Sequence, residues 1–256
     1  MDRTRSVVTA ERFAKGMTFD QYVRYVGTPE NLKREDGAWL SHPSMGTARR
    51  DWSAHLRATY ESARLSEAQA AALTWLASQP NGPAKLLVLS EEWSSDCRRD
   101  VPMLARLAEA AKLELRIFAR DGQQFSRSQR PSLAEAPDSN ADIMAEFLNE
   151  KNGQTWQSIP VAVFYTRSLE YLYHYVEGPA IYHKDRVVGH IRAAPPGESK
   201  DDTQRRGDRE FVELQRSPFF RIWACAAADE IISALHERLV VGYRGGALRP
   251  IRSRAR

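Results

Sequence analysis

Cysteine is scarce in this 256-residue chain, which contains two cysteines and six histidines. Two cysteines exclude a disulfide scaffold and a metal site built from cysteines alone. The histidines are scattered, and no pair has the His-x-x-x-His spacing that binds a metal from one helix face. The glycine-rich patterns G-x-G-x-x-G and G-x-x-x-x-G-K-[ST], which bind nucleotide phosphates, are also missing. We therefore expect neither a metal nor another cofactor.

Long apolar runs are missing as well. No stretch approaches the ~20 apolar residues of a membrane-spanning helix, and the polar start of the chain leads into no secretory signal. We therefore expect a cytoplasmic protein without a membrane partner. The net charge of +4 and the isoelectric point near 9.1 depend partly on arginines close to the C-terminal end. Because no aromatic platform for stacking bases accompanies them, we expect no nucleic-acid partner.

Strand and helix patterns alternate in the middle of the chain. The apolar run 85–89 has the length of a buried strand, residues 97–112 have helical spacing, and residues 113–118 alternate like a second strand. This order predicts two parallel strands joined by a helical crossover. Residues 161–165 and 169–176 then predict an antiparallel hairpin.

Short helical patterns come before the first strand. The length and the 42% share of hydrophobic residues allow one large domain or two small ones with a sizeable core. Residues 18–26 predict a short helix, and residues 50–64 repeat apolar and aromatic residues at helical spacing. Ser66 and Gln69 have the spacing of a capping box, which predicts that a new helix begins there.

The region after the second strand is more varied. Residues 121–140 are rich in serine, glutamine, proline and arginine and predict a long loop, and residues 141–148 predict a short amphipathic helix. Residues 195–207 predict a charged connector. Residues 211–239 are apolar at helical spacing and predict two helices broken near Pro218.

Three anchors in this order of elements resemble the thioredoxin superfamily over residues 66–190. Trp93 to Cys97 aligns with the family's W-C-x-x-C motif. Pro102 aligns with the proline that kinks the active-site helix, and Pro160 with the cis-proline that faces the active site. The sequence is most similar to a bacterial thioredoxin-like branch with the motif W-C-G-D-C.

The resemblance also implies the fold class. We expect an α/β chain with a thioredoxin-like three-layer fold. Helical patterns lie outside the part that resembles the family, so we assign them to an N-terminal helical extension and a C-terminal helical appendage. The expected parts are the N-terminal extension, residues 1–64; the thioredoxin-like domain, residues 65–192; and the C-terminal helices with a basic tail, residues 193–256.

The expected active-site turn departs from the family pattern. Ser94 stands where the family has its attacking cysteine, so the motif Ser94-Ser95-Asp96-Cys97 carries a single thiol. A serine hydroxyl is not ionised near neutral pH and forms no disulfide, so the usual dithiol cycle cannot run. The resemblance implies two catalytic residues, Cys97 and Ser94, and five substrate-binding residues, Trp93, Ser95, Asp96, Ile159 and Pro160.

The reactivity of Cys97 depends on opposing influences. A helix N-terminus favours the thiolate, and Arg98 and Arg99 lie beside it in sequence. Burial and the neighbouring carboxylates favour the thiol instead. The sequence does not decide the balance between them. The carboxylates near Cys97 are Glu91, Glu92, Asp96 and Asp100.

Three functions are therefore open. The first is a thiol-disulfide oxidoreductase in which Cys97 exchanges with protein or small-molecule thiols and disulfides. The second is a redox-inactive thioredoxin-like module that binds an extended peptide or a protein partner near Pro160. The third is a peroxiredoxin-like thiol peroxidase, with Ser94 at the threonine position of P-x-x-x-T-x-x-C, although Ser90 stands where that motif has proline. The oligomeric state is not predicted.

Two further features bear on the site. Cys225 has apolar neighbours typical of a core cysteine, and it would be a resolving partner for Cys97 only with Cα atoms within ~7 Å. The loop 121–140 leaves the carboxyl end of a parallel strand, where open α/β sheets bind ligands. We hypothesise that it covers or lines the site through Phe125, Arg127 and Arg130.

Overall fold

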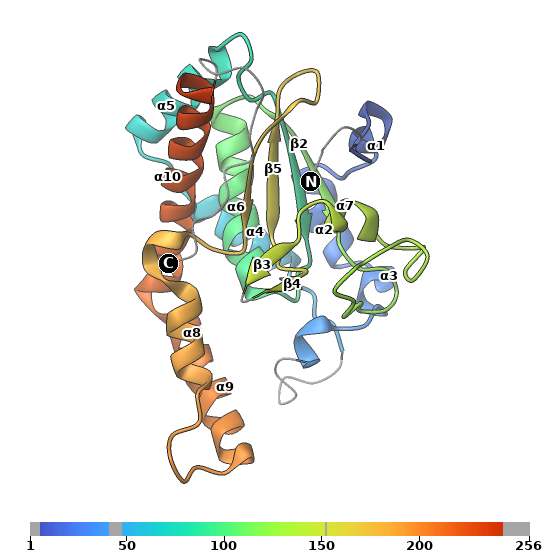
Figure 1. The fold of residues 1–256 in the computed structure, drawn as a ribbon, viewed down its shortest axis with the longest axis vertical. Coiled ribbons are helices and arrows are strands. Elements are labelled where there is room, and N and C mark those ends of the chain that lie inside the picture. The colour runs from blue at the N-terminus through green and yellow to red at the C-terminus, as the bar shows by residue number, and fades with distance from the viewer. Residues whose placement is uncertain (1–5, 41–47, 152, 243–256) are drawn as a thin grey trace.

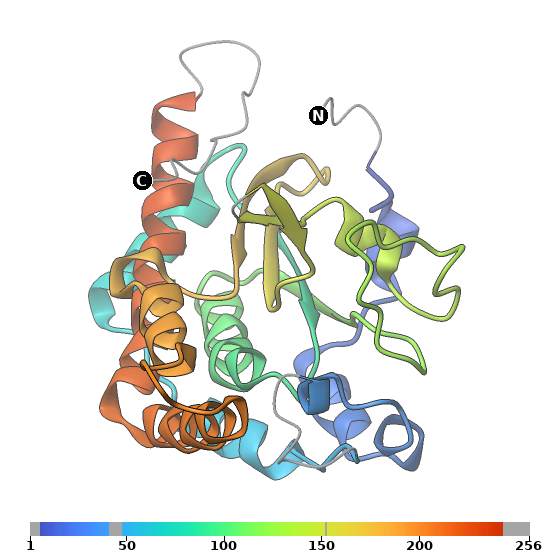
Figure 2. The same ribbon diagram turned by 60° about the horizontal axis from the view of Figure 1, so that its bottom comes forward.

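A four-stranded sheet forms the centre of the molecule, and helices lie to either side of it (Figures 1 and 2). The strands are arranged in the order β2–β1–β5–β6. The computed structural model describes residues 6–40, 48–151 and 153–242. Within these residues no helix is long and apolar enough to cross a membrane.

The strand pairing agrees with the expected α/β fold. β1 (Lys85–Ser90) pairs in parallel with β2 (Glu114–Ala119). β5 (Val161–Tyr165) pairs antiparallel with β1 and with β6 (Tyr171–Val176). The predicted parallel pair and the predicted hairpin are therefore both confirmed, with the last strand beginning two residues later than expected.

The two central strands supply much of the core. Residues 86–89 of β1 and 161–164 of β5 are all fully buried. Strands covered on both faces are apolar throughout rather than alternating, as these two are. α6 (Ser95–Ala110) links β1 to β2 and begins two residues earlier than predicted. The first turn of α6 therefore follows directly on the carboxyl end of a buried strand, which places residues 93–97 at the sheet edge.

The N-terminal extension shares this core. Phe13, Tyr22 and Val26 are buried in the same apolar cluster as the central strands. Met17 forms an isolated antiparallel bridge with Ile117, so the extension also adds to the edge of β2. Its helices are α1 (Ala10–Ala14), α2 (Phe19–Val26), α3 (Pro29–Leu32) and the 3-10 helix η1 (Gly37–Leu40).

Two further helices precede β1. α4 (Ser53–Ser62) lies within the predicted range 50–64 and packs against α6. α5 (Glu67–Ser78) begins with the predicted capping box. The Gln69 N–H donates to the Ser66 hydroxyl at 3.1 Å, while the Ser66 N–H donates to the Gln69 side chain at 2.9 Å.

A small hairpin after the long loop was not predicted. β3 (Asn149–Lys151) pairs antiparallel with β4 (Gln154–Trp156), and α7 (Ala141–Ala145) is shorter than the predicted 141–148 helix. Each strand is short and lacks an alternating pattern long enough to detect. Gly153 in the turn has a φ of +74°, a conformation that favours glycine.

The C-terminal appendage contains more helix than expected. The predicted connector 195–207 is wrong in its second half, because α9 begins at Lys200 after the capping residue Ser199. The predicted break near Pro218 is confirmed. α8 and α9 pack on each other and extend away from the body (Figure 1), whereas α10 packs against α5, α6 and β6. The helices after β6 are η3 (Ala180–Tyr182) and α8 (Lys184–Arg192), which precede the appendage, and α9 (Lys200–Arg216) and α10 (Pro218–Val240), which form it.

Candidate functional site

Ser94 has a structural role at the start of α6. It is the N-cap residue, and its hydroxyl accepts the N–H of Cys97 at 3.4 Å. Its own N–H donates to the carbonyl of Glu91 at 3.1 Å, which closes the turn. A serine at this position satisfies a helix N–H that would otherwise have no partner. The residue in the attacking position therefore stabilises the helix that carries Cys97.

Cys97 is buried rather than presented to solvent. Its exposed fraction is 1%, and its side chain belongs to the apolar core. Burial raises the pKa of the Cys97 thiol to about 12, although hydrogen bonds from Ser90, the Glu91 backbone and Ser94 act in the opposite direction. Burial therefore outweighs the influences that favour the thiolate, and Cys97 is held as a neutral thiol. Cys225 is exposed on α10, which corrects its assignment to the core, and both cysteines are free.

A first group of buried charges ties the N-terminal extension to the turn. This N-terminal cluster consists of Arg34, Arg49, Glu91 and Glu92. Arg34 reaches Glu91 at 2.7 Å, and Arg49 reaches Glu91 at 2.7 Å and Glu92 at 2.8 Å. Burial raises the pKa of Glu91, but the two arginines outweigh it and the net shift is downward. For Glu92 burial and the neighbouring Glu91 prevail, so its pKa is raised.

A second group of charges ties the end of β6 and the start of α8 to the first turn of α6. Arg99 reaches Asp96 at 2.8 Å and holds Asp100 through two hydrogen bonds of 2.6 and 2.7 Å. Lys184, at the start of α8, pairs with Asp96 and lies 3.5 Å from Glu177. Burial raises the pKa of Glu177, but Lys184 and Lys151 outweigh it and lower the value to about 2. The C-terminal cluster consists of Asp96, Arg99, Asp100, Glu177 and Lys184.

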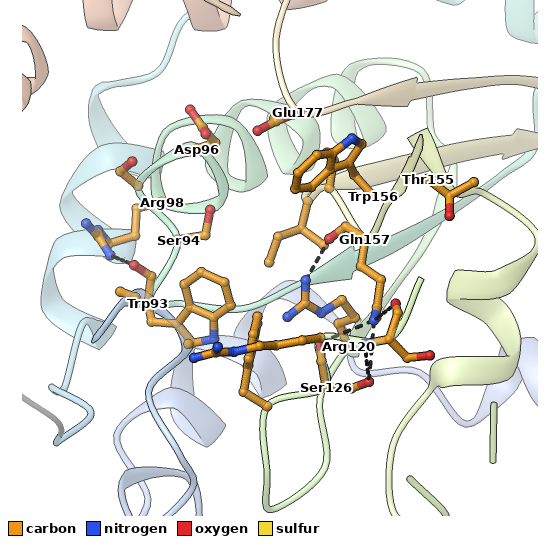
Figure 3. Close-up of a pocket in the computed structure, with 18 of the residues that line it drawn as sticks. Trp93, Ser94, Asp96, Arg98, Arg120, Ser126, Thr155, Trp156, Gln157 and Glu177 are labelled. Carbon is orange, nitrogen blue, oxygen red and sulfur yellow. Dashed lines mark hydrogen bonds between the residues drawn. The ribbon is translucent and has the colours of Figure 1, made fainter. Parts of the chain in front are cut away.

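A cavity of about 510 Å³ opens beside this turn (Figure 3). We call it the cleft. Five of the seven predicted site residues line it, whereas Cys97 and Pro160 are not among its lining residues. The Ile159–Pro160 peptide bond is cis. The predicted residues that do line the cleft are Trp93, Ser94, Ser95, Asp96 and Ile159.

The long loop supplies one wall of the cleft. Phe125 and Arg127 line it, as hypothesised, whereas Arg130 does not. Phe125 meets Trp93 edge to face, with ring centroids 5.8 Å apart. The side-chain amide of Gln157 donates to the carbonyls of Ser126 and Ser128 at 3.2 and 2.9 Å, which fastens the loop to the segment before Ile159.

Arg120 joins the walls at the base of the cleft. Its guanidinium lies 5.4 Å from the ring centre of Trp93 and 5.0 Å from that of Phe125. It donates to both carboxylate oxygens of Asp121, at 2.8 and 3.0 Å, and to the carbonyl of Gln157 at 2.6 Å. The strand end, the long loop and the segment before Pro160 are thereby held together by one side chain.

Several lining residues were missed by sequence reasoning. Trp156 lies on the unpredicted strand β4 and is 50% exposed. Gly37 faces the cleft from η1, and a Cβ at that position would lie 2.6 Å from atoms of both Trp93 and Phe125. No local pattern signals these contacts, because each depends on segments far apart in the chain. The other missed lining residues include Arg98, Arg120, Gln157, Arg192 and Phe211.

The comparisons with known proteins agree with the fold. A family model described as thioredoxin matches residues 43–136, which include the Trp93–Cys97 turn, all of α6 and most of the long loop. The fold and this match support a thioredoxin-superfamily assignment for the matched part of the chain. Pro160 and the C-terminal appendage lie outside the matched residues. A search of curated proteins found no match.

Two solved structures are similar to this chain at low identity. One is a protein of unknown function from Pseudomonas aeruginosa, with 14% identity and a TM-score of 0.46, covering 90% of this chain and 98% of that one. The other is an HIV epitope-scaffold protein, with 16% identity and a TM-score of 0.45, covering 91% of this chain and 98% of that one. Neither likeness bears on activity.

Proposed function

We propose that this protein is a redox-inactive thioredoxin-like binding module that takes an extended segment of a protein partner into the cleft. The observation that carries the proposal is the state of Cys97, which is buried and protonated beside a cleft that it does not line. Trp93, Ser95 and Ile159 then act as binding residues without a redox step.

Monothiol exchange is disfavoured by the same observation. The nucleophile in such exchange is the thiolate. With a pKa of about 12, only about one Cys97 thiol in 10⁵ is ionised at pH 7. A disulfide must also reach the sulfur, and its exposed fraction of 1% provides no approach. A peroxidase role meets the same two obstacles, because peroxide too is attacked by an exposed thiolate.

Binding is supported by free groups in the cleft wall. Ile159 lines the cleft, and neither its N–H nor its C=O has a hydrogen-bond partner among the described residues. An extended peptide can pair with such a backbone position as an added strand does. Trp93 and Trp156 provide apolar surface on the same cleft, and large aromatic side chains carry much of the affinity of binding sites.

The first experiment tests the thiol. In a Cys225→Ala background, we expect alkylation of Cys97 to be at least about a hundredfold slower in the native protein than in urea. A Cys97→Ala variant is the matched control, since its exposed Cys225 should react rapidly in both conditions. Rapid native alkylation of Cys97, with a midpoint below the usual ~8.5, would restore the oxidoreductase assignment.

The second experiment tests binding. A random-peptide display library is selected on the native protein, and the selected peptides are measured against Trp156→Ala and Trp75→Ala. Both tryptophans are about half exposed, but only Trp156 lines the cleft. We expect Trp156→Ala alone to weaken binding by about tenfold or more. Failure to select any peptide, or equal loss in both variants, contradicts the proposal.

A third variant tests whether the missing thiol at position 94 is enough to explain the absence of dithiol reductase activity. A cysteine at position 94 would line the cleft one helical turn from Cys97, within the Cα separation that a disulfide spans. We therefore expect Ser94→Cys to gain dithiol reductase activity towards insulin, with Ser95→Cys as the control that places the new thiol one residue away. An inactive Ser94→Cys protein would mean that more than the thiol has been lost.

A further inference from the structure

The cleft wall contains hydrogen-bond donors that have no acceptor among the described residues. The indole Nε1 of Trp93 is one of them, and it is buried. Arg98 does not add to these donors, because its guanidinium is 7% exposed, packs on the ring of Trp52 at 3.9 Å and donates to the carbonyls of Glu92 and Trp93, both at 2.7 Å. Arg127 is exposed and pairs with no carboxylate among the described residues. A buried donor without a partner costs free energy, so a ligand that supplies an acceptor gains affinity there.

The two carboxylates that line the cleft already have cationic partners. Asp96 is bound by Arg99 and Lys184, and Glu177 by Lys151 and Lys184. They therefore leave little negative charge to attract a cation. Arg127 is an exposed cation of the cleft wall that has no carboxylate partner among the described residues, which favours a ligand that carries carboxylates.

Aromatic rings form part of the remaining surface. Figure 3 shows Trp93 and Trp156 on opposite sides of the cleft, with Asp96 and Glu177 towards one end and Arg120 and Ser126 towards the other. Phe125 and Phe211 also line it. Flat indole faces favour ligand groups that are themselves compact and apolar.

We propose that the segment bound by the cleft contains proline flanked by acidic residues. The carbonyl before a proline accepts from Trp93 Nε1, and proline itself adds no N–H that would need an acceptor beside that donor. Its ring packs against indole, as in aromatic-lined grooves that bind extended proline-rich segments. Such segments are already extended when free, so they lose little conformational entropy on binding. The acidic flanks pair with Arg127, the exposed arginine of the cleft wall.

This inference rests on the proposed function and names the ligand class. The probe is a fluorescein-labelled octapeptide with four prolines between two pairs of glutamates. Its companions replace the prolines with alanine or the glutamates with lysine. By fluorescence anisotropy we expect the parent peptide to bind at least about tenfold more tightly than either companion.

The variants separate the contributions of the cleft residues. Trp93→Phe keeps a ring but removes the N–H, and we expect about fivefold to tenfold weaker binding of the parent peptide. Arg127→Gln should weaken the parent peptide but leave the lysine companion unchanged. Trp75→Phe, on α5, is the control and should change nothing.

The outcomes distinguish the two proposals. If the alanine companion binds as well as the parent, the proline inference is wrong, while the binding module stands. If the lysine companion binds as well, the acidic part of the inference is wrong. If none of the three peptides binds and the display library yields no peptide that depends on Trp156, both the inference and the proposed function fail.

Discussion

The two charge clusters on either side of the Trp93–Cys97 turn differ in depth. In the N-terminal cluster every paired side chain is at most 3% exposed. In the C-terminal cluster Arg99 and Asp100 are similarly buried, but Lys184 and Asp96 are 10% and 11% exposed, and Glu177 is 26% exposed. The N-terminal cluster joins the N-terminal extension to the carboxyl end of β1, and the C-terminal cluster joins the start of α8 to the first turn of α6.

This difference in burial predicts how strongly each segment is attached to the body of the protein. Removing one partner from a fully buried ion pair leaves an uncompensated charge, whereas water relieves a partly exposed one. We therefore expect the N-terminal extension to be part of the folding unit. The pairs of Lys184 fasten α8 to the body more weakly. The following predictions test this contrast.

The largest effect should come from Arg49→Met. Loss of this guanidinium leaves Glu92 with only the Asn31 amide and removes one of the two arginines of Glu91. We expect the free energy of unfolding to fall by about 3–5 kcal/mol, measured by urea denaturation. Adding Glu92→Gln should restore part of the loss. A decrease below about 1 kcal/mol would mean that the two clusters are equivalent.

Lys184→Met should cost less, about 1–2 kcal/mol, because Asp96 keeps Arg99 and Glu177 keeps Lys151. The effect should also be local. Hydrogen exchange should quicken in α8 and η3 but not in β1 or β5. Lys200→Met is the matched control at an exposed position on α9. Uniformly faster exchange across the sheet would contradict a local attachment.

The decrease in the free energy of unfolding at acid pH should depend on Glu177. Its pKa of about 2 in the folded protein lies below its usual 4.5, so the carboxylate contributes stability above pH ~4.5 and loses it as the pH falls towards 2. We expect Glu177→Gln to be less stable by roughly 1–2 kcal/mol at pH 6, with the gap closing near pH 2. Urea denaturation at several pH values measures the gap. A gap that stays constant would exclude this linkage.

Arg57→Ala should have the smallest effect. Arg57 pairs with Asp20 at 2.7 Å, but the two side chains are 41% and 62% exposed. Exposed pairs contribute little, so we expect a change within about 0.5 kcal/mol by thermal unfolding. A loss comparable to that of Arg49→Met would show that burial does not set the ranking.

Much of the fold followed from local patterns. The apolar run of β1, the alternation in β2 and the Ser66–Gln69 capping box each predicted the element that the structure contains. The first part of α9 was missed because charge and nearby proline and glycine resembled a connector, whereas Ser199 caps the helix and pairs such as Arg205–Asp202 support it. The β3–β4 hairpin was missed because three-residue strands carry no usable period.

The candidate site was predicted only in part. Trp93, Ser94, Ser95, Asp96 and Ile159 could be assigned because a family motif marks them. Trp156, Gly37 and Arg120 could not, since each reaches the cleft through contacts between distant segments. The catalytic roles of Cys97 and Ser94 remain predictions, and the burial of Cys97 argues against them.

The sequence by itself determined that position 94 carries no thiol, that a strand, helix and strand precede a hairpin, and that helices flank them. These features depend on residue identity and on periods within a few residues. Only the tertiary structure decided the chemistry of the turn. Arg34 and Glu91, 57 residues apart, meet in the core, and the surrounding chain covers Cys97. Burial and charge pairing arise from such distant contacts, so they set the pKa of the thiol and the shape of the cleft.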